Sequence, residues 1–173
     1  MKKYTKPIAS LRTIPPSRSL RGFGAQRTGK RYHCGTDLLS SYGTTVYCIE
    51  KGIVKNVFLF TYPALDRYNT YEKTYAVAIQ HEDGNYALYA EMQQPTIKIG
   101  QHVKPGQPIG KVGRIFAHRP THTMLHFEYH SRLPTKTTQW RMYNKPRGLL
   151  SSTIYLKNII LWTECAYMVT LLT

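Results

Sequence analysis

Between residues 44 and 130 the chain is a series of short segments rich in Val, Ile, Thr and Tyr, separated by turns that contain Gly. Residues of this kind favour strands, and so do the 14 Tyr of the whole chain. We expect strands over 44–49 and 53–60, joined by a short turn at Glu50-Lys51-Gly52 in which Gly supplies a positive φ. The pattern predicts a mostly β domain.

A second hairpin is predicted over residues 75–92. The strands 75–81 and 86–92 flank the turn sequence Glu-Asp-Gly-Asn. Because side chains alternate along a strand, Glu91 is expected to share a face with Ala87 and Tyr89. A further strand is predicted over 124–130, with Met124, His126 and Glu128 on one face. Residues 61–74 and 114–123 are expected to form loops, and 97–112 to form short strands and turns.

Three separated side chains form a candidate metal site. His33 and Asp37 lie four residues apart just before the β-rich region, and His126 follows some ninety residues later. Two imidazoles and one carboxylate are a set that zinc takes from a protein when its fourth position stays open. A hydrogen-bonded trio without metal is the alternative interpretation of the same residues.

The motifs around these residues resemble the lysostaphin- or LytM-type zinc endopeptidase domain of peptidase family M23. That family has H-x-G-x-D, here His33 to Asp37, followed by G-T-x-V at 43–46 and G-x-V at 52–54. Gly-containing turns over 99–110 and the sequence Leu-His-Phe-Glu at 125–128 follow in the family's order. The resemblance covers roughly residues 20–130 and implies an antiparallel β-sheet or small barrel-sandwich fold with zinc held by His33, Asp37 and His126.

Two positions depart from the family pattern. Met124 stands where the first His of the family's H-x-H is expected, and Glu91 follows Tyr-Ala where the family has another His. The resemblance implies that these histidines move the proton of a zinc-bound water and stabilise the oxyanion. A thioether does neither. Glu91 has two interpretations: a general base, or a fourth ligand that closes the metal site.

The sequence predicts a central domain with an extension on either side. We expect a basic N-terminal arm over 1–20, the M23-like domain over 21–131 and a C-terminal extension over 132–173. Residues 1–36 contain no acidic side chain. The cations assigned to the arm are Lys2, Lys3, Lys6, Arg12, Arg18 and Arg21. The apolar end of the extension is expected either to close the core or to contact a partner, and it is too interrupted by charge for a transmembrane helix.

Charge and cysteine content limit the function. The net charge of +15 suits an anionic polymer, such as RNA, DNA, peptidoglycan or teichoic acid, an acidic lipid surface, or an acidic neighbouring subunit. Three Cys without a C-x-x-C motif do not indicate a disulfide framework. No secretory signal is visible, and both an organellar (mitochondrial) location and the bacterial envelope are considered.

The sequence therefore predicts an inactive M23-like domain, with a retained or vestigial zinc site, that serves as a structural or binding subunit of a larger assembly. Two alternatives are kept. The first is an active zinc endopeptidase that cleaves peptidoglycan cross-links or Gly-rich peptides, with Glu91 as base. The second is a basic, nucleic-acid-associated protein on the same scaffold.

Overall fold

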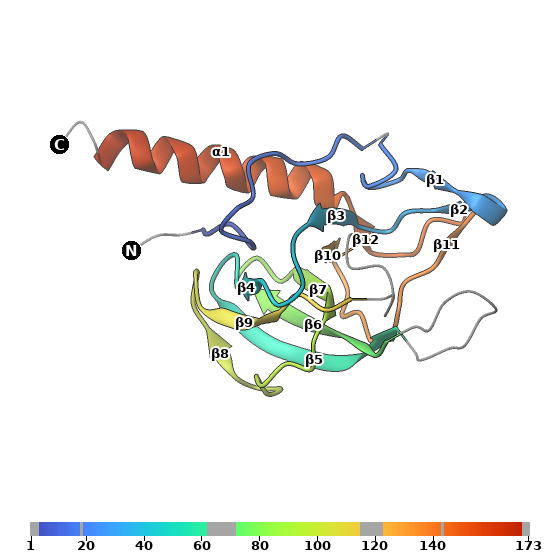
Figure 1. The fold of residues 1–173 in the computed structure, drawn as a ribbon, viewed down its shortest axis with the longest axis horizontal. Helices are drawn as coiled ribbons and strands as arrows, with labels where there is room; N and C mark the ends of the chain where they lie inside the picture. Colours follow the sequence, from blue (N-terminus) through green and yellow to red (C-terminus); the bar gives the residue numbers. More distant parts are fainter. Residues whose placement is uncertain (1–3, 18, 62–71, 115–122, 143, 171–173) are drawn as a thin grey trace.

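The computed structural model describes residues 4–17, 19–61, 72–114, 123–142 and 144–170, without the side chains of 164–170. Its centre is a seven-stranded antiparallel sheet (Figure 1). The strand order is β12-β10-β7-β6-β5-β8, and β3 pairs with β10 beside this path. The strands are β3 (Thr36–Leu39), β5 (Gly52–Thr61), β6 (Thr74–His81), β7 (Tyr86–Met92), β8 (His102–Val103), β10 (Met124–His130) and β12 (Leu149–Leu150). The mostly β fold predicted from the sequence is confirmed.

Two small sheets complete the β structure of the described residues. In one, β4 (Thr45–Tyr47) pairs with β9 (Pro108–Lys111). In the other, β1 (Gln26–Arg27) and β2 (Arg31–Tyr32) flank the 3-10 turn η1 (Thr28–Lys30), and β11 (Trp140–Arg141) pairs with β2. Most of the two loops predicted over 61–74 and 114–123 lies outside the described residues.

The predicted β6–β7 hairpin is confirmed, with Gly84 at φ +81° in its turn. Alternation along its strands creates two apolar layers. Val77, Ile79 and Tyr89 face the main core, where Tyr89 and Phe127 pack edge to face. The opposite layer is smaller and consists of Ala76, Ala78, Leu88 and Ala90, covered by Phe58 and Phe60.

The predicted pairing around Gly52 is wrong. β4 pairs with β9, whereas β5 pairs with β6 and β8. Gly52 is not among the glycines with positive φ. A Cβ at Gly52 would lie 2.4 Å from the carbonyl oxygen of Gln80, so glycine is required here because β5 and β6 approach closely. The turn that begins after β4 therefore carries the chain away from β4 instead of folding it back.

The N-terminal segment packs on the domain in its described part. Ile8 and Leu11 are buried in the main core, and the amide of Tyr47 in β4 donates to the carbonyl of Pro7. Lys6 is half-buried and Arg12 and Arg21 are exposed, while Lys2, Lys3 and Arg18 lie outside the described residues. The apolar residues of the predicted arm thus contribute to the core.

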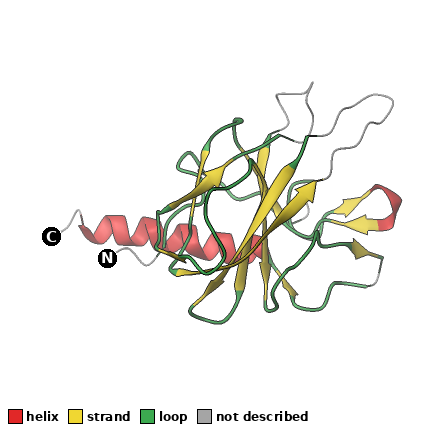
Figure 2. Ribbon diagram, turned by 90° about the horizontal axis from the view of Figure 1, so that it is seen from below, coloured by secondary structure: helices red, strands yellow, loops and turns green. Residues whose placement is uncertain are grey.

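The C-terminal segment forms one helix, α1 (Ser152–Thr170). Leu156 and Ile159 are buried in the main core, and the ring of Tyr155 stacks on that of Tyr129 at a centroid distance of 4.0 Å. Of the two expectations for this segment, core closure is confirmed. Figures 1 and 2 show the C-terminal end of α1 extending past the strands. Among the described residues, no helix is both long and apolar enough to span a membrane.

Candidate metal centre

Three elements bring the predicted ligands together. His33 directly follows β2, Asp37 lies in β3, and His126 lies in β10 opposite Asp37 in the antiparallel pairing. Gly35 allows the chain to cross His126 at close range, because a Cβ at this position would lie 2.7 Å from the imidazole and 2.5 Å from the carbonyl oxygen of Phe127. The glycine of the H-x-G-x-D motif is therefore a steric requirement of the site.

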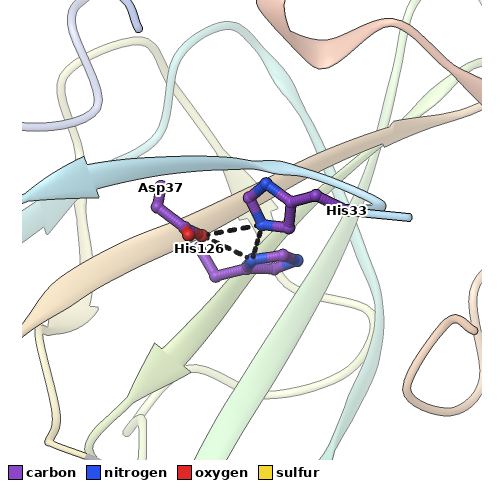
Figure 3. A group of neighbouring side chains, drawn as sticks. All are labelled: His33, Asp37 and His126. Atoms are coloured by element: carbon purple, nitrogen blue, oxygen red, sulfur yellow. Dashed lines mark hydrogen bonds and ion pairs between the residues drawn. The ribbon is translucent and has the colours of Figure 1, made fainter. Parts of the chain in front are cut away.

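One atom from each residue points to a common centre (Figure 3). Oδ1 of Asp37 lies 3.0 Å from Nε2 of His33 and 2.9 Å from Nδ1 of His126, and the two nitrogens are 3.3 Å apart. All three side chains are buried. Ligands placed 2.0–2.1 Å from a tetrahedral zinc are roughly 3.3 Å from one another. The spacing of the three atoms therefore fits a zinc ion.

The remaining ring nitrogens fix the orientation of both imidazoles. Nδ1 of His33 donates to the carbonyl oxygen of Gly22 at 2.9 Å, since that carbonyl accepts only. Nε2 of His126 donates to the Glu128 carboxylate at 2.9 Å. Each neutral imidazole then presents a lone pair to the centre, as a metal ligand must.

Without a cation, this centre would hold two lone pairs and a carboxylate facing one another. Burial lowers the pKa of His126, but its contacts with Asp37 and Glu128 outweigh this and raise the pKa well above its usual value. Burial opposes ionisation of Asp37, yet hydrogen bonds from His126 and His33 hold its pKa well below the usual range. The carboxylate of Asp37 and the two imidazoles therefore favour a cation between them, either a proton or a metal ion.

Glu128 anchors a polar network behind His126. Its buried carboxylate accepts hydrogen bonds from Nε2 of His130 and Oγ1 of Thr138, each at 2.7 Å, in addition to the one from His126. Burial raises the pKa of Glu128, but the hydrogen bonds from His126 and His130 lower it to about 2. Sequence reasoning assigned no role to these three residues. The shared face of His126, Glu128 and His130 was a usable signal, whereas Thr138 carried none.

Arg27 is a further residue that sequence reasoning missed. Its guanidinium donates to Oδ2 of Asp37 at 3.0 Å, so both oxygens of this carboxylate are engaged. The contact holds Asp37 with Oδ1 directed at the two imidazoles. Arg27 lies on β1, outside the H-x-G-x-D motif, and nothing in its immediate sequence indicates this contact.

Glu91 lies on the metal side of the sheet because of a backbone irregularity that simple strand alternation did not predict. The backbone of Glu91 has a φ of +60°. Three residues separate Tyr89 from Met92 along β7, whereas their partners in β6, Val77 and Tyr75, are only two residues apart. Both features mark a β-bulge at Glu91. Met92 therefore packs in the main core together with Tyr89. The expected face shared by Ala87, Tyr89 and Glu91 is wrong, because the bulge turns Glu91 away from that core.

The Glu91 carboxyl lies near the site but outside the ligand cluster. Burial raises its pKa to about 7, with His126 and Arg27 opposing the rise and Asp37 adding to it. Among the described residues, His33, Asp37 and His126 are the one group of three potential ligands whose ligand atoms all lie within 4.8 Å of one another. The role of Glu91 as fourth ligand or as base stays a prediction. Met124 is half-buried on β10, opposite Leu39.

Comparison with known proteins identifies the family. The model of peptidase family M23 matches residues 31–139, and the chain belongs to this family. Peptidoglycan DD-endopeptidase ShyC of Vibrio cholerae is 31% identical over 97 residues, which are 56% of this chain and 20% of that protein. The chain thus spans a fifth of the length of this relative.

Two solved structures share the fold. A zinc-containing peptidase from Vibrio cholerae has a TM-score of 0.53 at 26% identity, covering 74% of this chain and 36% of the other. The catalytic domain of lysostaphin from Staphylococcus simulans has a TM-score of 0.53 at 22% identity, covering 79% and 89% of the two chains. The resemblance inferred from the motifs is confirmed at the level of family and fold. Peptidases of this family are typically zinc-dependent.

Proposed function

We propose that this chain is a zinc-binding M23 domain without peptidase turnover, which serves as a structural or binding module. The observation that carries the proposal is an asymmetry of the site. His33, Asp37 and His126 are oriented for a metal by Gly22, Arg27 and Glu128, whereas the position two residues before His126 on the same strand face holds Met124. The metal set is complete and the proton-transfer set is not.

His33, Asp37 and His126 would hold the zinc ion, which supplies Lewis acidity to a bound water or carbonyl. Hydrolysis also needs a side chain that takes and returns a proton. Loss of such a group costs about 10²–10⁴-fold in rate. The sulfur of Met124 is a feeble acceptor and cannot carry out this step.

The test combines metal content with a cleavage assay. We expect purified protein to contain about one zinc per chain and to leave both peptidoglycan and pentaglycine intact. His126→Ala should lose the metal. Lys98→Gln, a control at an exposed lysine between β7 and β8, should retain it. Absence of zinc from protein purified and dialysed in zinc-containing buffer would refute the proposed metal site.

An active zinc endopeptidase is the second candidate, and Glu91 is the observation that favours it. Its carboxyl is buried on the metal side of β7, has a pKa raised to about 7 by burial, and accepts no hydrogen bond from another described residue. A base with such a pKa suits reaction at neutral pH. Cleavage by the wild type that is abolished in Glu91→Gln, with zinc retained, would establish this function. Weakened zinc binding in Glu91→Ala without any cleavage would instead identify Glu91 as a ligand.

A protein partner is part of the proposed role. Its support is the outer side of α1, where Ile154, Leu161 and Trp162 are each more than 60% exposed. Large apolar side chains grouped on a surface are typical of contact sites. A partner that co-purifies with the wild type but not with a Leu161→Ser/Trp162→Ser variant would support the assembly, and equal recovery with both proteins would place the contact elsewhere.

A further inference from the structure

Three arginines lie side by side across the three-stranded sheet β1-β2-β11. In β1, β2 and β11 the paired residues are Arg27 with Arg31, and Arg31 with Arg141. Directly paired residues of antiparallel strands project from the same face. We call Arg27, Arg31 and Arg141 the arginine row. Neighbouring strands lie about 4.8 Å apart, so the row spans roughly 10 Å.

The opposite face of this sheet is packed with aromatic rings. Tyr32 and Trp140 are paired, with centroids 5.2 Å apart, and Phe23 lies 5.6 Å from Trp140. Lys145 sits over both Phe23 and Trp140. Trp140 on this face packs against the cluster of Phe23, Cys34 and Leu149. The arginine row lies on the opposite face, where Arg27 reaches Asp37 of the metal centre.

The row is not neutralised within the described part of the chain. Arg31 and Arg141 are exposed and form no ion pair with a described residue, and only Arg27 has an acidic partner, Asp37. Like charges on directly opposite positions of a sheet are unfavourable. A sheet of six residues that places three of them as adjacent arginines is therefore expected to have an anionic ligand.

The surrounding sequence extends this positive field. Residues 1–36 contain nine Lys and Arg, and residues 129–163 contain six, with no Asp or Glu in either segment. These segments are far apart in the chain, and the pairing of β2 with β11 joins them. Figure 1 shows the small sheet at one end of the molecule, opposite the free end of α1.

We propose that the arginine row binds successive phosphate groups of a single-stranded nucleic acid. The guanidinium fork matches phosphate geometry, and a line of three guanidinium groups suits a chain whose charges repeat at regular intervals. The net charge of +15 adds long-range attraction for such a polymer. This activity goes beyond the proposed zinc-binding role, because Arg31 and Arg141 lie outside the metal ligand set.

The test compares two variants of equal charge. Arg31→Gln/Arg141→Gln removes two members of the row, and Lys98→Gln/Lys104→Gln removes two exposed lysines near β8. Binding of a fluorescent 16-nucleotide strand is measured by anisotropy between 50 and 200 mM salt. We expect the arginine variant to bind about tenfold more weakly, with a log–log salt slope reduced by about 1.4, and the lysine variant to resemble the wild type.

A stability measurement separates binding from structure. Relief of like-charge repulsion should leave the melting temperature of the free arginine variant equal to or above that of the wild type. A polyglutamate of equal charge serves as the competing ligand. Equal loss in both variants would overturn the proposal in favour of net charge alone, and equal affinity for polyglutamate would overturn it in favour of an acidic protein. Titrations in EDTA should give the same affinity, so failure of the zinc site would not affect this result.

Discussion

At the scale of single residues, the orientation of His126 depends on Glu128. Residues two apart on a strand share a face, so the carboxylate of Glu128 lies beside the imidazole and accepts from Nε2. This contact leaves Nδ1 free for the centre shared with His33 and Asp37. A metal ligand whose second nitrogen is unsupported is expected to rotate or change tautomer.

We expect Glu128→Gln to weaken zinc affinity by about 10–100-fold, because partners of this kind have effects of that size when mutated. Competition with a chromophoric chelator measures the change. Glu82→Gln is the matched control, since Glu82 is exposed on the β6–β7 turn. Affinity equal to that of the control, in a variant with an unchanged melting curve, would show that Glu128 has no positioning role.

His81 predicts a pH dependence unrelated to the metal. Burial lowers its pKa, although Glu50 and the carbonyl of Lys51 partly oppose this shift, and its buried Nε2 has no hydrogen-bond partner among the described residues. Because the folded pKa lies below the unfolded value of about 6.5, the unfolded chain binds the proton more readily. The contribution of His81 to stability is therefore present above pH 6.5 and is lost as the pH falls through the folded pKa.

Urea unfolding of the wild type and His81→Gln between pH 5 and 8 measures this effect. The difference in unfolding free energy should be constant above pH 7. Below pH 6.5 the unfolding free energy of the wild type should fall relative to that of His81→Gln by up to about 1.4 kcal/mol per pH unit. Parallel curves across the whole range would mean that His81 does not titrate differently in the two states.

At the scale of elements, α1 closes the core through one side. Leu156 is 1% exposed within the main core, whereas Leu161 is 61% exposed on the outer side. We expect Leu156→Ala to lower the unfolding free energy by about 3 kcal/mol, because the removed atoms leave a cavity. Leu161→Ala should change it by less than about 0.5 kcal/mol. Denaturant unfolding of both variants tests the contrast, and equal effects would contradict the packing of α1.

Strands with strong local signals were predicted well from the sequence. The 124–130 strand and the β6–β7 hairpin have nearly the predicted bounds. Pairing partners were harder, since β4 joins β9 over sixty residues away instead of its neighbour β5. The bulge at Glu91 could not be predicted, because a non-glycine residue rarely adopts a positive φ and no local sequence feature indicates one here.

At the scale of the whole molecule, the ligands were easier to predict than their supports. His33, Asp37 and His126 belong to motifs that the family model also covers. Arg27 and Thr138 lie on other segments and meet the site only through the tertiary fold. Their contacts depend on chain topology, which hydrophobic pattern and turn chemistry did not specify.

Because the fold and the three-residue ligand cluster are present, we expect the side chains at positions 91 and 124 to limit hydrolysis. We expect Glu91→His/Met124→His to cleave pentaglycine at least about 100-fold faster than the wild type, since each histidine supplies a proton-transfer or oxyanion-stabilising group. Each single variant should remain near the wild-type rate. A double variant that holds zinc and cleaves nothing would show that side chains beyond these two suppress activity.

The placement of Ile8, Leu11, Leu156 and Ile159 in one core also sets an order of events during synthesis. The N-terminal segment can pack on β4 earlier, but the part of the core that Leu156 and Ile159 cover stays open until α1 has left the ribosome. Apolar surface of the sheet is exposed throughout that interval, which is the condition under which nascent chains aggregate or recruit chaperones. Any cleavage or stop between β12 and α1 would therefore release a chain whose core was never completed.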